Sequence, residues 1–327
     1  MNRPALRLAL VFLSLALCCP AQAQQVKKAP RIGFLAITSP RDMSLRMAAF
    51  RHGLRELGYI EGKTIVVDDR YAEGKLDRLR SMTAELVQLK ADVIVTSGPI
   101  GTRTAKEATA TLPIVMAYDN DPVASGFVAS LARPGGNITG LSTHYPEITG
   151  KQLELLKEIV PKMSHLAVLG DSSEPFTAQS LKETERAAKA FGVQLQYLDV
   201  KDPKDVKSAL EDARKSRADA AVVLASAIFI SQRSQLAELA VKNRLPAVYQ
   251  ASEYVEAGGL MTYGASITDL FRRAATYVDR ILKGAKPADI PVEQPTTFEL
   301  IINLRAAREI GLTIPPNVLA RADRIIK

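Results

Sequence analysis

Short apolar runs alternate with longer amphipathic segments along nearly the whole sequence. The apolar runs predict strands at residues 31–36, 64–69, 92–95, 113–117, 165–169, 193–198, 220–224, 247–249, 259–263 and 297–302. The amphipathic segments predict helices at residues 43–57, 76–89, 102–110, 152–160, 178–191, 205–216, 231–243, 267–283 and 304–310. Strands that alternate with helices form βαβ units and parallel sheets, so we expect an α/β fold.

The same rhythm restarts near Gly150, which predicts two α/β lobes of similar size. A further helix and strand follow the second lobe, so we expect the chain to pass between the lobes more than once. Open α/β sheets bind ligands at the carboxyl ends of their strands. A ligand would therefore sit between the lobes, in a cleft lined by both sets of strand ends.

The first 23 residues have the pattern of a secretory signal peptide. Arg3 and Arg7 precede an apolar stretch at residues 8–19, and Ala21-Gln22-Ala23 is a small-residue cleavage signal. We expect export to the periplasm. A retained anchor is one alternative, and lipidation of Cys18 or Cys19 is another, which the bulky Leu17 disfavours.

Charge and apolar length exclude two other classes of protein. The 43 Lys and Arg against 35 Asp and Glu give a formal charge of +8. Removing Arg3 and Arg7 leaves 41 − 35 = +6. No basic cluster is interleaved with aromatic residues, so we expect no nucleic-acid partner. No later segment approaches the roughly 20 apolar residues of a membrane-spanning helix.

The stretch at residues 113–142 contains the most informative strand end. An apolar run is followed by the acidic loop 118–122, and we expect a helix-like segment at 123–132. Asp121 precedes Pro122, which is typical of a helix N-cap followed by Pro at the first helical position. Asp119 is the better candidate for ligand contact. Ser39 and Ser97 end two other strands, where they either face the same ligand or cap the next helices.

The sequence contains no recognisable catalytic set. His52, His144 and His165 have no metal-ligand spacing. There is no G-x-S-x-G, P-loop or G-x-G-x-x-G motif. The pair Asp119 and Asp121 leaves acid–base catalysis or a calcium site as alternatives. We predict a binding protein without a cofactor or metal, and not an enzyme.

Several segments together resemble the ABC transporter substrate-binding proteins of the tryptophan and tyrosine type. The resemblance lies in residues 54–59, 61–62, 71–74, 92–98, 121–123, 130–140, 153–158, 255–261 and 311–315. It implies the type I periplasmic-binding-protein fold, with two Rossmann-like lobes joined by a three-crossing hinge. Residues 30–141 with about 264–290 would form lobe one, and residues 142–263 with about 291–327 lobe two.

The resemblance also implies two partners: a small solute such as an amino acid, and an ABC permease in the inner membrane that receives the solute. It further implies that the binding protein is a monomer. Docking on a sensory receptor is an alternative, and an exported α/β enzyme is another. The implied ligand-binding residues are Ser39, Thr96, Ser97, Ala117 and Asp119 in lobe one, with Asp171, Ser172, Ser226, Tyr249 and Glu253 in lobe two and Tyr263 near the hinge. Many relatives have Val-Gly where this chain has Asp119-Asn120. The extra carboxylate favours a ligand that contains an ammonium group.

Overall fold

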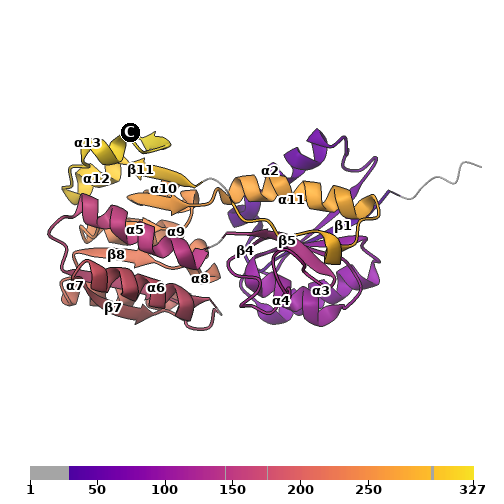
Figure 1. The fold of residues 1–327 in the computed structure, drawn as a ribbon, viewed down its shortest axis with the longest axis horizontal. Coiled ribbons are helices and arrows are strands. Elements are labelled where there is room, and N and C mark those ends of the chain that lie inside the picture. Colours follow the sequence, from indigo (N-terminus) through magenta and orange to yellow (C-terminus); the bar gives the residue numbers. More distant parts are fainter. Residues whose placement is uncertain (1–28, 144, 175, 296–297) are drawn as a thin grey trace, which may run out of the picture.

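A computed structural model of the 327-residue chain describes residues 29–143, 145–174, 176–295 and 298–327. Two α/β lobes lie side by side, each built on its own sheet (Figure 1). The predicted signal peptide and His144 fall outside the described residues. No helix of the described part is long and apolar enough to cross a membrane.

The first lobe contains a five-stranded parallel sheet in the order β2-β1-β3-β4-β5. Its strands are β1 (Arg31–Ala36), β2 (Val66–Tyr71), β3 (Val93–Ser97), β4 (Ile114–Asp119) and β5 (Ile138–Ser142). Helices α3 (Leu76–Gln88) and α4 (Gly98–Ala108) pack on one face, and α2 (Pro40–Glu56) packs on the other. Because side chains alternate along a strand, β1 buries Phe34 on one face and Leu35 on the other.

The second lobe contains a seven-stranded sheet in the order β12-β11-β10-β9-β8-β6-β7. Its strands are β6 (His165–Gly170), β7 (Gln194–Asp199), β8 (Ala220–Val223), β9 (Ala247–Tyr249), β10 (Met261–Gly264), β11 (Glu299–Asn303) and β12 (Arg324–Ile326). The helices are α5 (Tyr145–Ile159), α6 (Thr177–Ala190), α7 (Val206–Lys215), α8 (Ala227–Ser231), α9 (Arg233–Lys242), α10 (Ser252–Glu256), α12 (Leu304–Ile310) and α13 (Pro316–Leu319). The sheet is parallel except that β10 and β11 run antiparallel.

The chain passes between the lobes after β5, after β10 and before β11. After β10 it returns to the first lobe as α11 (Ile267–Leu282), which packs along α2 (Figure 1). Residues 290–293 then run beside β5, where the amide of Glu293 donates to the carbonyl of Gly140. The first lobe is therefore completed by residues from the carboxyl-terminal part of the sequence.

One predicted helix was wrong, and two strands were missed. The segment at residues 123–132, which we expected to be helical, consists of turns, bends and irregular structure. Asp121 still accepts a hydrogen bond from the amide of Ala124 at 2.9 Å, so it caps a turn instead of a helix. The strands β5 and β12 were not predicted, because Gly140 interrupts the apolar pattern of one and the other has only three residues.

Candidate functional site

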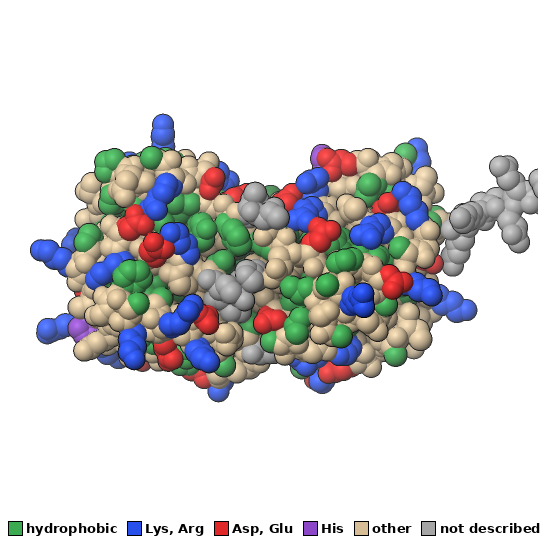
Figure 2. All heavy atoms as spheres, viewed as in Figure 1, with side chains coloured by type: hydrophobic (Ala, Val, Ile, Leu, Met, Phe, Trp, Pro, Cys, Tyr) green, Lys and Arg blue, Asp and Glu red, His purple; other side chains and the backbone are tan. Residues whose placement is uncertain are grey.

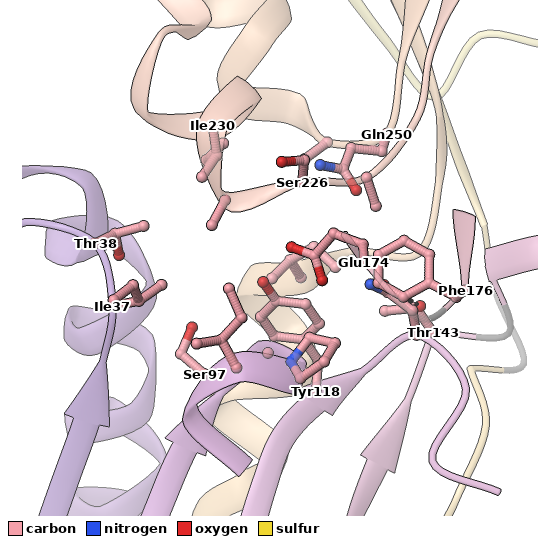
Figure 3. A pocket seen from close by; sticks show the side chains of 18 of the residues that line it. Ile37, Thr38, Ser97, Tyr118, Thr143, Glu174, Phe176, Ser226, Ile230 and Gln250 are labelled. Atoms are coloured by element: carbon pink, nitrogen blue, oxygen red, sulfur yellow. Dashed lines mark hydrogen bonds between the residues drawn. The ribbon is translucent and has the colours of Figure 1, made fainter. Parts of the chain in front are cut away.

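A cavity of about 730 Å³ lies between the two lobes, at the carboxyl ends of their parallel strands (Figure 3). Its volume includes space open to solvent. Both lobes supply its walls. The lining residues are Ile37, Thr38, Arg46, Ser97, Gly98, Pro99, Ile100, Tyr118, Asn120, Thr143, Ile148, Glu174, Phe176, Ala225, Ser226, Ala227, Ile230, Gln250, Ala251, Ala265 and Ile267.

The wall from the first lobe is rich in hydrogen-bond donors. Ser97 to Ile100 bring the N-terminus of α4 to the cavity, where backbone N–H groups have no intrahelical partner. Helix N-termini favour negative ligand groups. The Thr38 hydroxyl lies in the same wall and is buried, with no hydrogen-bond partner among the described residues.

Gly98 begins α4 because the chain turns sharply between β3 and the helix. Its φ of +76° lies in the left-handed region, which glycine adopts without strain. A Cβ atom here would lie 3.1 Å from the Tyr118 hydroxyl oxygen. The glycine thus allows the helix to start directly against the aromatic ring of the neighbouring strand.

The charged group of the second lobe's wall is Glu174, in the loop after β6. Its side chain points into the cavity (Figure 3), and it is only 6% exposed. Burial raises its pKa to about 7, the nearby Asp171 carboxylate adds to the rise, and the backbone N–H of Ala227 opposes it. Its Oε2 atom has no hydrogen-bond partner among the described residues. This oxygen is placed to accept from a donor in the cavity.

Asp119 ends β4 behind this cavity and is fully buried. Its Oδ1 accepts from the amide of Asp121 at 3.1 Å, while its Oδ2 has no partner among the described residues. Burial raises its pKa to about 8, and the charge of Glu174 contributes to the rise. Burial therefore disfavours the charged form of both carboxyl groups, and of the two only Glu174 lines the cavity.

Apolar side chains fill the remaining wall. Ile148, Phe176 and Ala225 form one buried cluster of the second lobe, and Ile37 and Ile100 face them from the first. Such a chamber suits a small solute with one apolar portion. No group of three or more His, Cys, Asp or Glu side chains that could hold a metal occurs in the part that the structure describes.

Two ion pairs connect α2 of the first lobe with the second lobe. Arg46 Nε lies 2.6 Å from Glu253 Oε1 on α10, and the two side chains are 5% and 9% exposed. Burial alone would raise the pKa of Glu253, but the Arg46 guanidinium holds it below its usual value. Asp42 forms the second pair with Arg233 on α9. These two pairs join the lobes across the cleft.

Comparison with known proteins assigns the chain to a family. The family model described as ABC transporter substrate binding protein matches residues 31–326. The chain belongs to the ABC transporter substrate-binding protein family. A curated relative, a tyrosine-binding protein from Clostridioides difficile (strain R20291), is 26% identical over 277 residues, covering 85% of this chain and 79% of that protein.

Solved structures of similar proteins support the same assignment. The ABC domain in complex with L-Trp from Streptococcus pneumonia has a TM-score of 0.85 and 30% identity, covering 91% of this chain and 99% of that one. A conserved domain protein from Vibrio cholerae has a TM-score of 0.86 and 28% identity, covering 91% and 100%. The predicted family, the type I fold and the substrate-binding function in an ABC transporter are thereby confirmed. The family is a class of solute-binding proteins that act outside the cytoplasm.

In this substrate-binding protein, two of the residues predicted from sequence line the cavity: Ser97 and Ser226. Asp171 accepts from the Ser226 hydroxyl at 3.1 Å and lies in the adjoining outer groove. Ser39 also lies in that groove and caps α2 through a bond from the amide of Asp42.

The other predicted residues lie away from the cavity surface or serve the lobes themselves. Thr96 is hydrogen bonded to Thr102, and Ala117 lies in the core of the first lobe. Ser172 donates to Asp199 at 2.8 Å. Tyr249 and Tyr263 are not among the lining residues, since Tyr249 stacks on Tyr254 at 4.9 Å and Tyr263 on Phe298 at 5.9 Å. Glu253 pairs with Arg46, as described above.

Sequence reasoning missed the acidic group and most of the apolar wall. Glu174 follows the polar run 170–173 after a predicted strand, and the same strand-end argument that selected Asp119 applies to it. Phe176, Ile148 and Gln250 had no comparable signal, because their sequence patterns do not distinguish a cavity wall from a core.

Proposed function

We propose that this substrate-binding protein captures an amino acid or a closely related ammonium-bearing solute and delivers it to an ABC permease. The observation that carries the proposal is the buried, cavity-facing Glu174 carboxylate with one unpartnered oxygen. An ammonium group supplies several donors and a compensating charge, so it offsets the cost of burying that carboxylate. The tyrosine-binding relative and the L-Trp complex support an amino acid as the solute.

The cellular setting belongs to the same proposal. A signal peptide at residues 1–23 would export the chain to the periplasm, where a monomer would bind solute without catalysing its conversion. The lobes would move as units, residues 30–141 with about 264–290 against residues 142–263 with about 291–327. Closure of such lobes around a solute is a hinge motion. The binding set we propose is Thr38, Ser97, Asn120 and Glu174, with Ser226 at its edge.

Calorimetric titration with L-tyrosine and L-tryptophan tests the proposal. We expect the wild-type protein to bind at least one of them, and not 3-(4-hydroxyphenyl)propionate, which lacks the ammonium group. The Glu174→Gln variant should bind about 10- to 100-fold more weakly, the loss expected for a charge-assisted hydrogen bond of about 1.5–3 kcal/mol. Glu185→Gln, on the exposed face of α6, is the matched control and should bind normally. Equal binding by Glu174→Gln would reject the role of this carboxylate.

A further inference from the structure

A hydrogen bond between two cavity-lining residues, Asn120 and Thr143, orients the Asn120 amide. Asn120 and Thr143 are each 4% exposed, and both line the cavity. The Thr143 hydroxyl lies 3.2 Å from Asn120 Oδ1 and can donate to it. An amide side chain carries one acceptor oxygen and one NH₂ donor group. Because the oxygen of Asn120 already accepts from Thr143, its NH₂ group is the part of this cavity-lining side chain that remains to donate to a solute.

Thr143 is itself held in place by the backbone. Its amide donates to the carbonyl of Asp119 at 2.8 Å, and its hydroxyl lies 3.4 Å from the same oxygen, farther than from Asn120. Thr143 directly follows β5, at the first passage of the chain between the lobes. The orientation of the Asn120 amide is therefore tied to the end of β5, where the chain first leaves the first lobe.

Hydrogen-bond donors line the first-lobe wall of the cavity, and an acceptor, Glu174, lines the second-lobe wall. Thr38, the N-terminus of α4 and Asn120 all belong to the first lobe, and all can donate. Glu174 accepts from the opposite lobe. Arg46, which also lines the cavity, is neutralised by Glu253 at 2.6 Å.

We propose that Asn120 is a specificity-determining residue that donates to the carboxylate of the solute, while Glu174 accepts from its ammonium group. The cleft then selects an amino acid over the amine with the same side chain, because the amine has no acceptor for the amide. This inference rests on the proposed function. It adds a residue that distinguishes between ammonium-bearing solutes.

The test compares L-tyrosine with tyramine, its decarboxylated analogue, by calorimetric titration. In Asn120→Asp the NH₂ group becomes a second oxygen, so L-tyrosine should bind about 10- to 100-fold more weakly, whereas tyramine should bind as well as before or better. Thr143→Val removes the hydroxyl at nearly constant shape, and it should lower the preference for L-tyrosine in the same direction. Thr143→Ser keeps the hydroxyl and should retain the preference.

The outcomes separate the two proposals. If the wild-type protein binds neither probe nor L-tryptophan, the proposed amino-acid function fails, and this inference fails with it. If L-tyrosine binds but Asn120→Asp weakens both probes equally, or strengthens L-tyrosine, the role of Asn120 is overturned while the proposed function stands. Should Asn120→Asp fail to fold, an unchanged L-tyrosine to tyramine ratio in Thr143→Val would overturn it.

Discussion

The buried ion pair between Arg46 and Glu253 leads to a quantitative prediction about lobe closure. Replacing Glu253 with Gln preserves the shape of the side chain and removes its charge. Arg46 Nε lies 2.6 Å from the carboxylate, and both side chains are less than one tenth exposed. Leaving one charge of such a pair buried costs about 3–5 kcal/mol. The lobes can avoid this cost by opening, which returns the Arg46 guanidinium to water.

We therefore expect the Glu253→Gln variant to shift toward the open arrangement. Each 1.4 kcal/mol is a tenfold change, so a cost of about 3–5 kcal/mol should lower solute affinity by about 100- to 4,000-fold when binding requires closure. The melting temperature of the solute-free protein should change little, because the pair lies between the lobes. Small-angle X-ray scattering measures the expansion, and calorimetric titration measures the affinity.

A matched control is available on the surface of the second lobe. Arg305 and Glu309 form an ion pair whose side chains are 75% and 51% exposed, so Glu309→Gln should alter neither closure nor affinity. Wild-type scattering and wild-type affinity in Glu253→Gln would refute the reasoning. A lowered melting temperature without expansion would instead assign the pair to the stability of the fold.

Three other predictions concern stability. Burial raises the pKa of Asp119 to about 8 and that of Glu174 to about 7, so at these two groups the folded state binds more protons than the unfolded chain between about pH 4 and 8. Its melting temperature should therefore fall as pH rises through this window, and Asp119→Asn should flatten the fall in scanning calorimetry; an unchanged slope would contradict this. Gly140→Ala should lower the free energy of unfolding, measured by denaturant titration, by about 3 kcal/mol or more. Gly140 has a φ of +140°, and a Cβ atom there would lie 2.2 Å from the Met116 carbonyl oxygen. A loss below about 1 kcal/mol would refute this prediction. Tyr249→Phe should stabilise the protein by about 1 kcal/mol and leave solute affinity unchanged, since the hydroxyl is buried with no partner among the described residues; weaker solute binding would place this hydroxyl in the site.

The sequence predicted the fold well because central strands such as β1, β3 and β8 are buried on both faces. The run at residues 32–36 is continuously apolar, and the helix after it places Met43, Met47 and Phe50 on one buried face. Both patterns follow from local periodicity. The segment 123–132 was misassigned because its apolar residues at Phe127 and Val128 pack from turns, which periodicity does not distinguish from a helix.

The site was harder to predict, because it depends on which strand ends meet between the lobes. Ser97 and Ser226 follow directly from the position of strand ends, and both line the cavity. The pairing of Arg46 with Glu253 joins residues 207 positions apart, and no local pattern contains it. The surface offers little further guidance, since Lys and Arg are interspersed with Asp and Glu over the visible face of both lobes (Figure 2).

The most direct test of the central claim is a mass spectrum of the solute retained by the protein. The wild-type protein and Glu174→Gln would be incubated with an equimolar mixture of the twenty amino acids, passed through a desalting column, and unfolded to release what they hold. We expect the wild-type protein to release one or a few amino acids, and Glu174→Gln to release much less. Equal release by the two proteins, or no amino acid from the wild type, would contradict the account.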